Sequence, residues 1–222
     1  MRKDLTEVVF ILDKSGSMSG LESDTIGGFN SLIEKQKKEE GEAFISVVLF
    51  NDDSHVIYDR VPIEKIEPMN DKQYFVGGCT ALLDAIGGAI HHIGNVHKYA
   101  REEDRPEKTL FIITTDGMEN SSHQYTYDKV KKLVEKQKET YGWEFLFLGA
   151  NIDAIDVAGR FGIGTDRAVN YECDDIGTRH NFACLDKMVT GARRAKSKGS
   201  MGKAMAECCE EINLDCKARH NK

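Results

Sequence analysis

Apolar runs alternate with amphipathic stretches along most of this chain. Six runs have the length and composition of β-strands, and they lie at residues 6–12, 44–50, 54–60, 109–115, 143–148 and 167–170. The central parts of these runs, such as VVFIL and LFII, are continuously apolar, which is typical of strands covered on both faces. The pattern therefore predicts a mainly parallel sheet between two layers of helices.

Between the strands, apolar residues recur every three or four positions, as they do on one face of a helix. The stripes are Ile26, Phe29 and Ile33; Leu82, Ile86, Ile90 and Ile93; Val130, Leu133 and Val134; and Phe182, Leu185 and Val189. This alternation indicates right-handed crossovers and a doubly wound α/β fold. Residues 51–54 indicate a turn, so we expect the strand at 54–60 to run antiparallel at the sheet edge.

The pattern weakens after about Ala195. For 222 residues we expect one large domain over residues 1–195, followed by a tail over 196–222. Residues 196–202 resemble a linker, and residues 203–212 form at most a short helix. The remainder of the tail is expected to be frayed or disordered.

Composition narrows the class of protein. Hydrophobic residues make up 40% of the chain and the formal net charge is −7. An acidic chain of this kind argues against a nucleic-acid binder, because such proteins need a basic face. One basic cluster, residues 193–198, is explained better by a solvated helix end than by an RNA or phosphate site.

No signal-peptide pattern precedes the first strand, and no apolar stretch reaches 18 residues. We therefore expect a cytoplasmic protein without membrane contact, whose six cysteines are mostly reduced. The cysteines form no CxxC pair, so a structural zinc site is not expected. His91, His92 and His97 share a helix whose apolar stripe is complete without them, and we interpret them as exposed or partly buried side chains.

Oxygen-bearing side chains follow two of the strands and open one helix. Asp13, Ser15 and Ser17 come directly after the strand at 6–12, Thr80 lies in a Gly-Gly-Cys-Thr loop, and Asp116 follows the strand at 109–115. Because parallel strands end at one edge of the sheet, these loops can converge there. Hard oxygen donors suit Mg²⁺ (or Mn²⁺) rather than zinc or copper.

This donor set contains few carboxylates. A cation held mainly by hydroxyls and water keeps much of its charge, so it favours an incoming Glu or Asp carboxylate from a protein partner. We expect binding rather than enzymatic activity, because catalysis also requires a base or nucleophile near the metal.

The DxSxS…T…D set, the apolar strand before it and the Gly-Gly-Cys-Thr-Ala-Leu loop resemble the von Willebrand factor type A (vWA) domain and its metal-ion-dependent adhesion site (MIDAS). The resemblance covers residues 5–190 and is greatest to stand-alone intracellular bacterial or phage members, including those associated with tellurite resistance. It implies a six-stranded sheet in the order 3-2-1-4-5-6 with helices on both faces.

The resemblance also implies roles for single residues. Ser15 and Ser17 would bind the metal directly, Thr80 would do so when a ligand is bound, and Asp13 and Asp116 would often act through water. Two departures stand out: a thiol, Cys79, precedes Thr80, and the tail after residue 195 has no counterpart in the family.

The Asp, Ser and Thr residues of this donor set allow three other interpretations. Helix N-caps explain one Asp or Ser, but not the whole set. A Mg²⁺-dependent phosphohydrolase would use Asp13 as its nucleophile, but the second carboxylate that such enzymes place two residues later is Ser15 here. In a scaffold protein, the metal would be only structural and binding would use the basic cluster or the tail.

Overall fold

The computed structural model describes residues 1–220 and contains one sheet with the strand order β3-β2-β1-β4-β5-β6. The strands are β1 (Arg2–Asp13), β2 (Glu42–Phe50), β3 (Ser54–Pro62), β4 (Pro106–Thr115), β5 (Glu144–Gly149) and β6 (Ala168–Asn170). β3 is antiparallel to β2, and the other neighbouring pairs are parallel. The predicted doubly wound α/β fold, its strand order and its antiparallel edge strand are confirmed.

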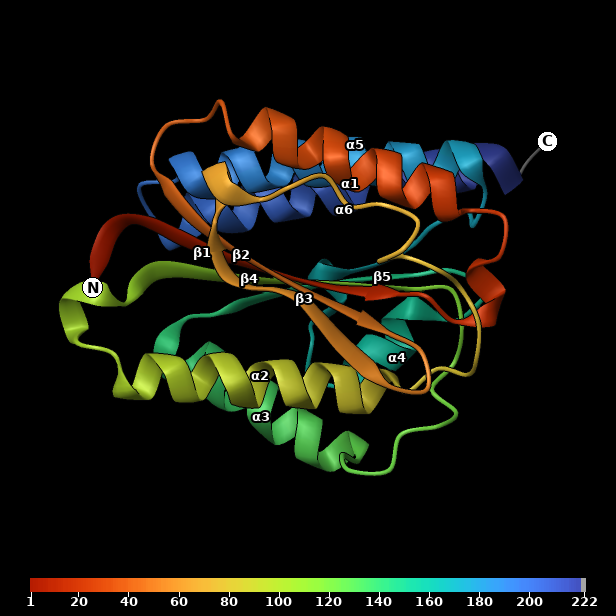
Figure 1. Cartoon of the computed structure of the whole chain (residues 1–222), viewed down its shortest axis with the longest axis horizontal. Helices are drawn as coiled ribbons and strands as arrows, with labels where there is room; N and C mark the ends of the chain where they lie inside the picture. The colour runs from red at the N-terminus through yellow and green to blue at the C-terminus, as the bar shows by residue number, and fades with distance from the viewer. Residues whose placement is uncertain (221–222) are drawn as a thin grey trace.

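Helices cover both faces of the sheet (Figure 1). They are α1 (Glu22–Gln36), α2 (Leu82–Tyr99), α3 (Tyr127–Tyr141), α4 (Ala154–Arg160), α5 (Asp175–Arg194) and α6 (Lys198–His220). α1, α5 and α6 pack on one face, and α2, α3 and α4 pack on the other. The short helix α4 has no counterpart in the sequence prediction, although Asp153 caps its first turn by accepting a hydrogen bond from the backbone N–H of Asp156.

The central strand explains why its sequence is apolar without alternation. Phe10 and Leu12 face the layer of α1, α5 and α6, whereas Val9 and Ile11 face the layer of α2 and α3. All four side chains are almost completely buried. Because successive side chains of a strand point to opposite faces, a strand with helices on both sides has no polar face.

The tail differs from its prediction. α6 begins at Lys198 and is 23 residues long, so most of the expected linker is helical and the expected short helix is extended at both ends. Its buried side chains, Met201, Met205, Cys208, Cys209 and Ile212, belong to the same core cluster as α5. The expectation of disorder for residues 221–222 lies outside the described residues.

The basic cluster is a solvated helix end only in part, because Arg193 points into the protein. The Arg193 side chain is buried, and its guanidinium donates hydrogen bonds to the backbone oxygens of Gln36, Glu39 and Gly41. These carbonyls lie at and just after the end of α1, where helix carbonyls lack partners within the helix. Arg193 therefore caps α1, whereas Arg194 and Lys196 are exposed.

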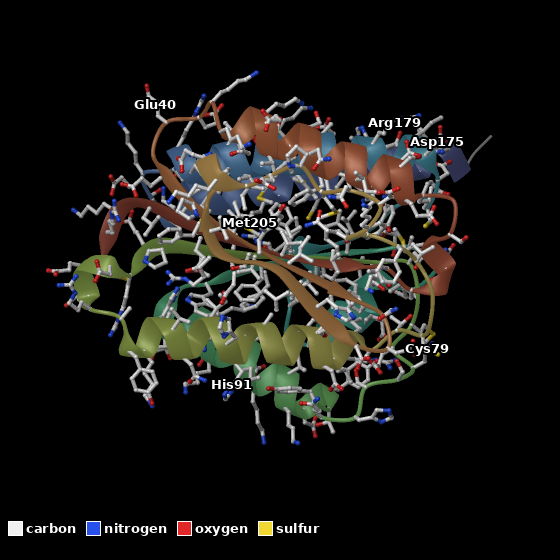
Figure 2. The ribbon with its side chains drawn as sticks, viewed as in Figure 1. Glu40, Cys79, His91, Asp175, Arg179 and Met205 are labelled. Atoms are coloured by element: carbon white, nitrogen blue, oxygen red, sulfur yellow. The ribbon has the colours of Figure 1, made fainter. Side chains whose placement is uncertain are left out.

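The three histidines of α2 have different surroundings. His91 and His92 are exposed, and His91 points away from the sheet in Figure 2. His97 is buried and its Nε2 contacts the Glu7 carboxylate at 2.5 Å. Within residues 1–220, no helix has the length and apolar character needed to cross a membrane.

Candidate metal centre

The predicted site residues lie at the edge of the sheet where β1 and β4 end. These two strands are neighbours, and the chain leaves β1 toward β2 on one side and β4 toward β5 on the other. Ligands of open α/β sheets bind in the crevice at such a switch point. Asp13 is the last residue of β1, and Asp116 directly follows β4. Cys79, on the loop before α2, marks this edge in Figure 2.

Three oxygen atoms of the predicted set form a continuous chain. The hydroxyls of Ser15 and Ser17 lie 3.1 Å apart, and Ser17 Oγ donates to Asp116 Oδ1 at 2.5 Å. Thr80 lies beside this chain of oxygens, because a β-carbon added to Gly117 would lie 3.5 Å from Ser17 Oγ and 3.6 Å from Thr80 Oγ1. Four of the five predicted residues therefore converge through their side-chain oxygens.

The fifth residue, Asp13, lies behind this group. It is 1% exposed; its Oδ1 accepts from the backbone N–H of Ser15 at 2.7 Å, and its Oδ2 accepts from Thr115 Oγ1 at 2.6 Å. Burial raises the pKa of the Asp13 carboxyl, while the hydrogen bonds from Ser15 and Thr115 act in the opposite direction. Asp13 therefore holds the Ser15 backbone in place.

The glycine pair before Thr80 shapes the second loop. The backbone N–H of Gly77 donates to the Lys14 oxygen at 2.9 Å, and that of Gly16 donates to the Gly78 oxygen at 3.1 Å. Gly78 has a φ of 78°, and a β-carbon there would lie 1.9 Å from Asp52 Oδ2. Only glycine fits this position, so the pair allows the loop to lie against the Asp13–Ser17 segment.

Thr80 is fixed by the loop that follows β4. Its backbone N–H donates to Asn120 Oδ1 at 2.8 Å, and the Asn120 N–H donates back to the Thr80 oxygen at 3.1 Å. Asn120 thereby ties Thr80 to the segment that contains Asp116.

Sequence reasoning missed Thr115 and Cys173. The Cys173 thiol donates to Asp116 Oδ2 over 3.6 Å, and burial together with the nearby Asp116 charge raises its pKa to about 12. Cys79, the thiol singled out from the sequence, is exposed and bonds instead with Asp52, which raises its pKa. Cys173 lies just beyond β6, so the rule that strand ends converge would have indicated it.

The donor set fits a hard divalent cation. In an octahedral site with metal–oxygen bonds of about 2.1 Å, neighbouring ligand oxygens lie about 3.0 Å apart. The Ser15–Ser17 and Ser17–Asp116 oxygen separations of 3.1 and 2.5 Å lie on either side of that value. Burial also raises the pKa of Asp116, so a cation would offset the cost of keeping two buried carboxylates charged.

No family model matches this chain, and no curated protein matches it. Solved structures with a similar fold include proximal thread matrix protein 1 from the mussel byssus with a zinc-occupied MIDAS motif, at 15% identity over 86% of this chain and 47% of that one (TM-score 0.56). A von Willebrand factor type A structure from Catenulispora acidiphila is 15% identical over 85% and 43% of the two chains (TM-score 0.53).

Manganese-loaded TRAP protein from Plasmodium vivax is 17% identical over 73% of this chain and 64% of that one (TM-score 0.51). The present chain thus spans between 43% and 64% of the length of these three structures. At these identities the similarity concerns the fold alone. The strand order, the two helix layers and these similarities together show that the chain has a von Willebrand factor type A fold.

Proposed function

We propose that this protein is a metal-dependent interaction module. It binds Mg²⁺ (or Mn²⁺) through Asp13, Ser15, Ser17, Thr80 and Asp116, and the bound cation accepts a Glu or Asp carboxylate of a partner protein. The observation that carries this proposal is the chain of oxygens from Ser15 through Ser17 to Asp116, with separations of 3.1 and 2.5 Å.

Exposure divides the roles among these residues. Ser17 is exposed, whereas Asp13, Ser15, Thr80 and Asp116 are buried. The buried oxygens of Ser15, Thr80 and Asp116 would hold the cation from the protein side, with Asp13 orienting Ser15 behind them, and the open side next to Ser17 would receive the partner's carboxylate. The cation would supply a local positive charge on a chain whose formal net charge is −7, and so allow an acidic partner to approach.

The rim of the site suits a protein partner. Phe75 and Met118 are large apolar side chains with 56% and 60% of their surface exposed. Phe75 follows Tyr74, whose hydroxyl donates to the Asp13 backbone oxygen at 2.6 Å, and Met118 lies two residues after Asp116. Aromatic and Met side chains are enriched at protein interfaces, so exposed ones beside a charged anchor suit a protein partner.

Structures with the same fold give further support. The mussel byssus protein has a zinc-occupied MIDAS motif, and the TRAP protein is manganese-loaded. A divalent cation at the corresponding edge of the sheet is therefore compatible with this architecture. The choice of Mg²⁺ or Mn²⁺ here rests on the oxygen donors of this chain.

The phosphohydrolase alternative has less support. A nucleophilic carboxylate needs a free oxygen directed at the substrate, but both oxygens of Asp13 already accept hydrogen bonds, from Ser15 and from Thr115. The scaffold alternative is also weakened, because part of its proposed binding surface is internal: α6 contributes buried side chains to the core, and Arg193 caps α1.

Calorimetric titration of Mg²⁺ and Mn²⁺ into the metal-free protein tests the proposal, with Ser15→Ala as the disabled site. Ser19→Ala, which changes an exposed hydroxyl in the same segment, is the matched control. We expect about one equivalent of metal to bind to the wild type and to Ser19→Ala, but not to Ser15→Ala.

Affinity capture then tests the partner. A partner retained by the wild type in Mg²⁺ should be released by EDTA and should not bind Ser15→Ala. Metal binding that is unchanged by Ser15→Ala, or partner binding that is insensitive to EDTA, would contradict the proposal.

A further inference from the structure

A second group of metal-ligating side chains lies between α5 and α6, apart from the residues discussed above. His180 and Cys184 are one helical turn apart on α5, and Glu211 lies on α6. The imidazole nitrogen, thiol sulfur and carboxylate oxygen that they offer all lie within 4.8 Å of one another. Figure 2 marks the two helices with Arg179 on α5 and Met205 on α6.

The spacing of the two α5 residues fits a tetrahedral metal. His180 Nε2 and Cys184 Sγ are 3.5 Å apart. For zinc bonds of about 2.3 Å to sulfur and about 2.1 Å to nitrogen at a tetrahedral angle, the two ligand atoms lie about 3.6 Å apart, close to the observed separation. Helical residues at positions i and i+4 lie on the same face, so α5 presents both atoms to one point without distortion.

The charges at this place also suit a divalent ion. A Cys thiolate and a Glu carboxylate together carry two negative charges, which neutralise Zn²⁺ in a half-buried interface. Lys187 Nζ lies 2.7 Å from Glu211 Oε1. A carboxylate has two oxygens, so Glu211 can keep Lys187 on one oxygen and bind a metal through the other.

We propose that His180, Cys184 and Glu211 bind one Zn²⁺ ion, with a water molecule as the fourth ligand. Cys184 binds as the thiolate, and its proton is released to solvent. The mixed nitrogen, sulfur and oxygen ligands distinguish this site from the all-oxygen centre, which favours Mg²⁺ or Mn²⁺.

Zinc at this position would join α6 to α5. α6 is held by buried side chains along its length and, near its end, by an ion pair between Arg219 and Asp174. A metal bridge adds a link midway that the unfolded chain cannot form. Zn²⁺ at a hundredfold excess over its Kd should therefore raise the Tm by about 5–10 °C.

Cobalt substitution tests the site directly, because a cobalt–thiolate bond gives a charge-transfer absorption that an oxygen site does not. Co²⁺ is titrated into the reduced, metal-free full chain in excess Mg²⁺, which occupies the all-oxygen centre. We expect a thiolate band that saturates at one equivalent and is removed by Zn²⁺.

Two variants and one control identify the ligands. Cys184→Ser should abolish the band, and Glu211→Gln, a change at a half-buried position, should weaken Zn²⁺ binding at least about tenfold. Cys209→Ser is the matched control. The Cys209 thiol is buried, as the Cys184 thiol is, but it lies on α6 and its charged neighbours are Arg167 and Asp166. Absence of the band in the wild type, its survival in Cys184→Ser, unchanged zinc affinity in Glu211→Gln, or loss of the band in Cys209→Ser would overturn the proposal.

Discussion

Thr115 donates a hydrogen bond from its Oγ1 to Oδ2 of Asp13 across 2.6 Å and so joins the ends of β4 and β1. Both side chains are almost completely buried. The other Asp13 oxygen accepts from the backbone N–H of Ser15, which begins the hydroxyl chain of the candidate metal centre. A threonine outside the recognised motif thus orients the carboxylate on which the motif depends.

We predict that Thr115→Val, which keeps the side-chain shape but removes this donor, lowers the free energy of unfolding by about 1–3 kcal/mol because a buried carboxylate oxygen loses its partner. Mg²⁺ affinity should fall by about tenfold, as it does when supporting hydrogen bonds of a metal site are lost. Urea unfolding and calorimetric titration measure the two effects. Thr114→Val, on the opposite face of β4, is the control and should change Mg²⁺ affinity little.

The buried carboxylates also predict a dependence of stability on pH. Burial raises the pKa of both Asp13 and Asp116 above the ordinary value of 3.8. The metal-free folded protein therefore binds protons more tightly than the unfolded chain. The contribution of these two carboxylates to stability should fall as pH rises through 3.8 and level off above their raised pKa values.

Asp116→Asn tests this effect, because it removes one of the two charges at nearly constant shape. In EDTA at neutral pH the variant should have a Tm equal to or above that of the wild type, with a shallower decline from acidic to neutral pH. In Mg²⁺ the order should reverse, because only the wild type gains stability from the metal. A variant that is less stable than the wild type in EDTA at neutral pH would contradict the prediction.

The predictable part of the site follows from strand topology. Asp13 and Asp116 each follow a long apolar strand, and parallel neighbours must end at the same edge, so their proximity could be inferred from the order of the elements. Cys173 could be overlooked because it follows β6, which is only three residues long. Thr115 could be overlooked because a threonine at the end of an apolar strand has no distinctive sequence signal.

The parts of the fold that sequence reasoning missed depend on contacts between distant residues. Arg193 is buried because unpaired carbonyls at the end of α1 accept its hydrogen bonds, and nothing near Arg193 in the sequence indicates this. α6 lacks a broad apolar stripe, and it packs closely where Gly191 meets Ala204: a β-carbon on Gly191 would lie 2.7 Å from that of Ala204. Tertiary packing thus stabilises a segment whose local composition resembles a linker.

A cluster of ionisable side chains around Glu7, on the face of β1 that α2 covers, gives a further prediction. Glu7 is fully buried; its Oε1 accepts from Arg60 Nε at 2.6 Å and its Oε2 contacts His97 Nε2 at 2.5 Å. Glu7→Ala should lower the free energy of unfolding by about 3–5 kcal/mol, because it leaves the half-buried Arg60 guanidinium and the buried His97 side chain without their carboxylate partner. Glu42→Ala removes the exposed partner of Arg2 and should cost less than about 1 kcal/mol. Urea unfolding that gave equal losses for both variants would contradict this role of Glu7.

Substitution of two adjacent glycines of α1 by alanine should change the free energy of unfolding in opposite directions. A β-carbon on Gly28 would lie 2.3 Å from Cδ2 and 3.0 Å from Cβ of Phe182 on α5, whereas no described atom lies within 4 Å of one on Gly27. Gly28→Ala should therefore lower the free energy of unfolding by about 1–3 kcal/mol through overpacking. Gly27→Ala should raise it by about 0.5–1 kcal/mol, because alanine loses less backbone entropy in a helix. Urea unfolding of the two variants measures both signs, and a Gly28→Ala variant as stable as Gly27→Ala would show that α1 and α5 do not pack as closely as described.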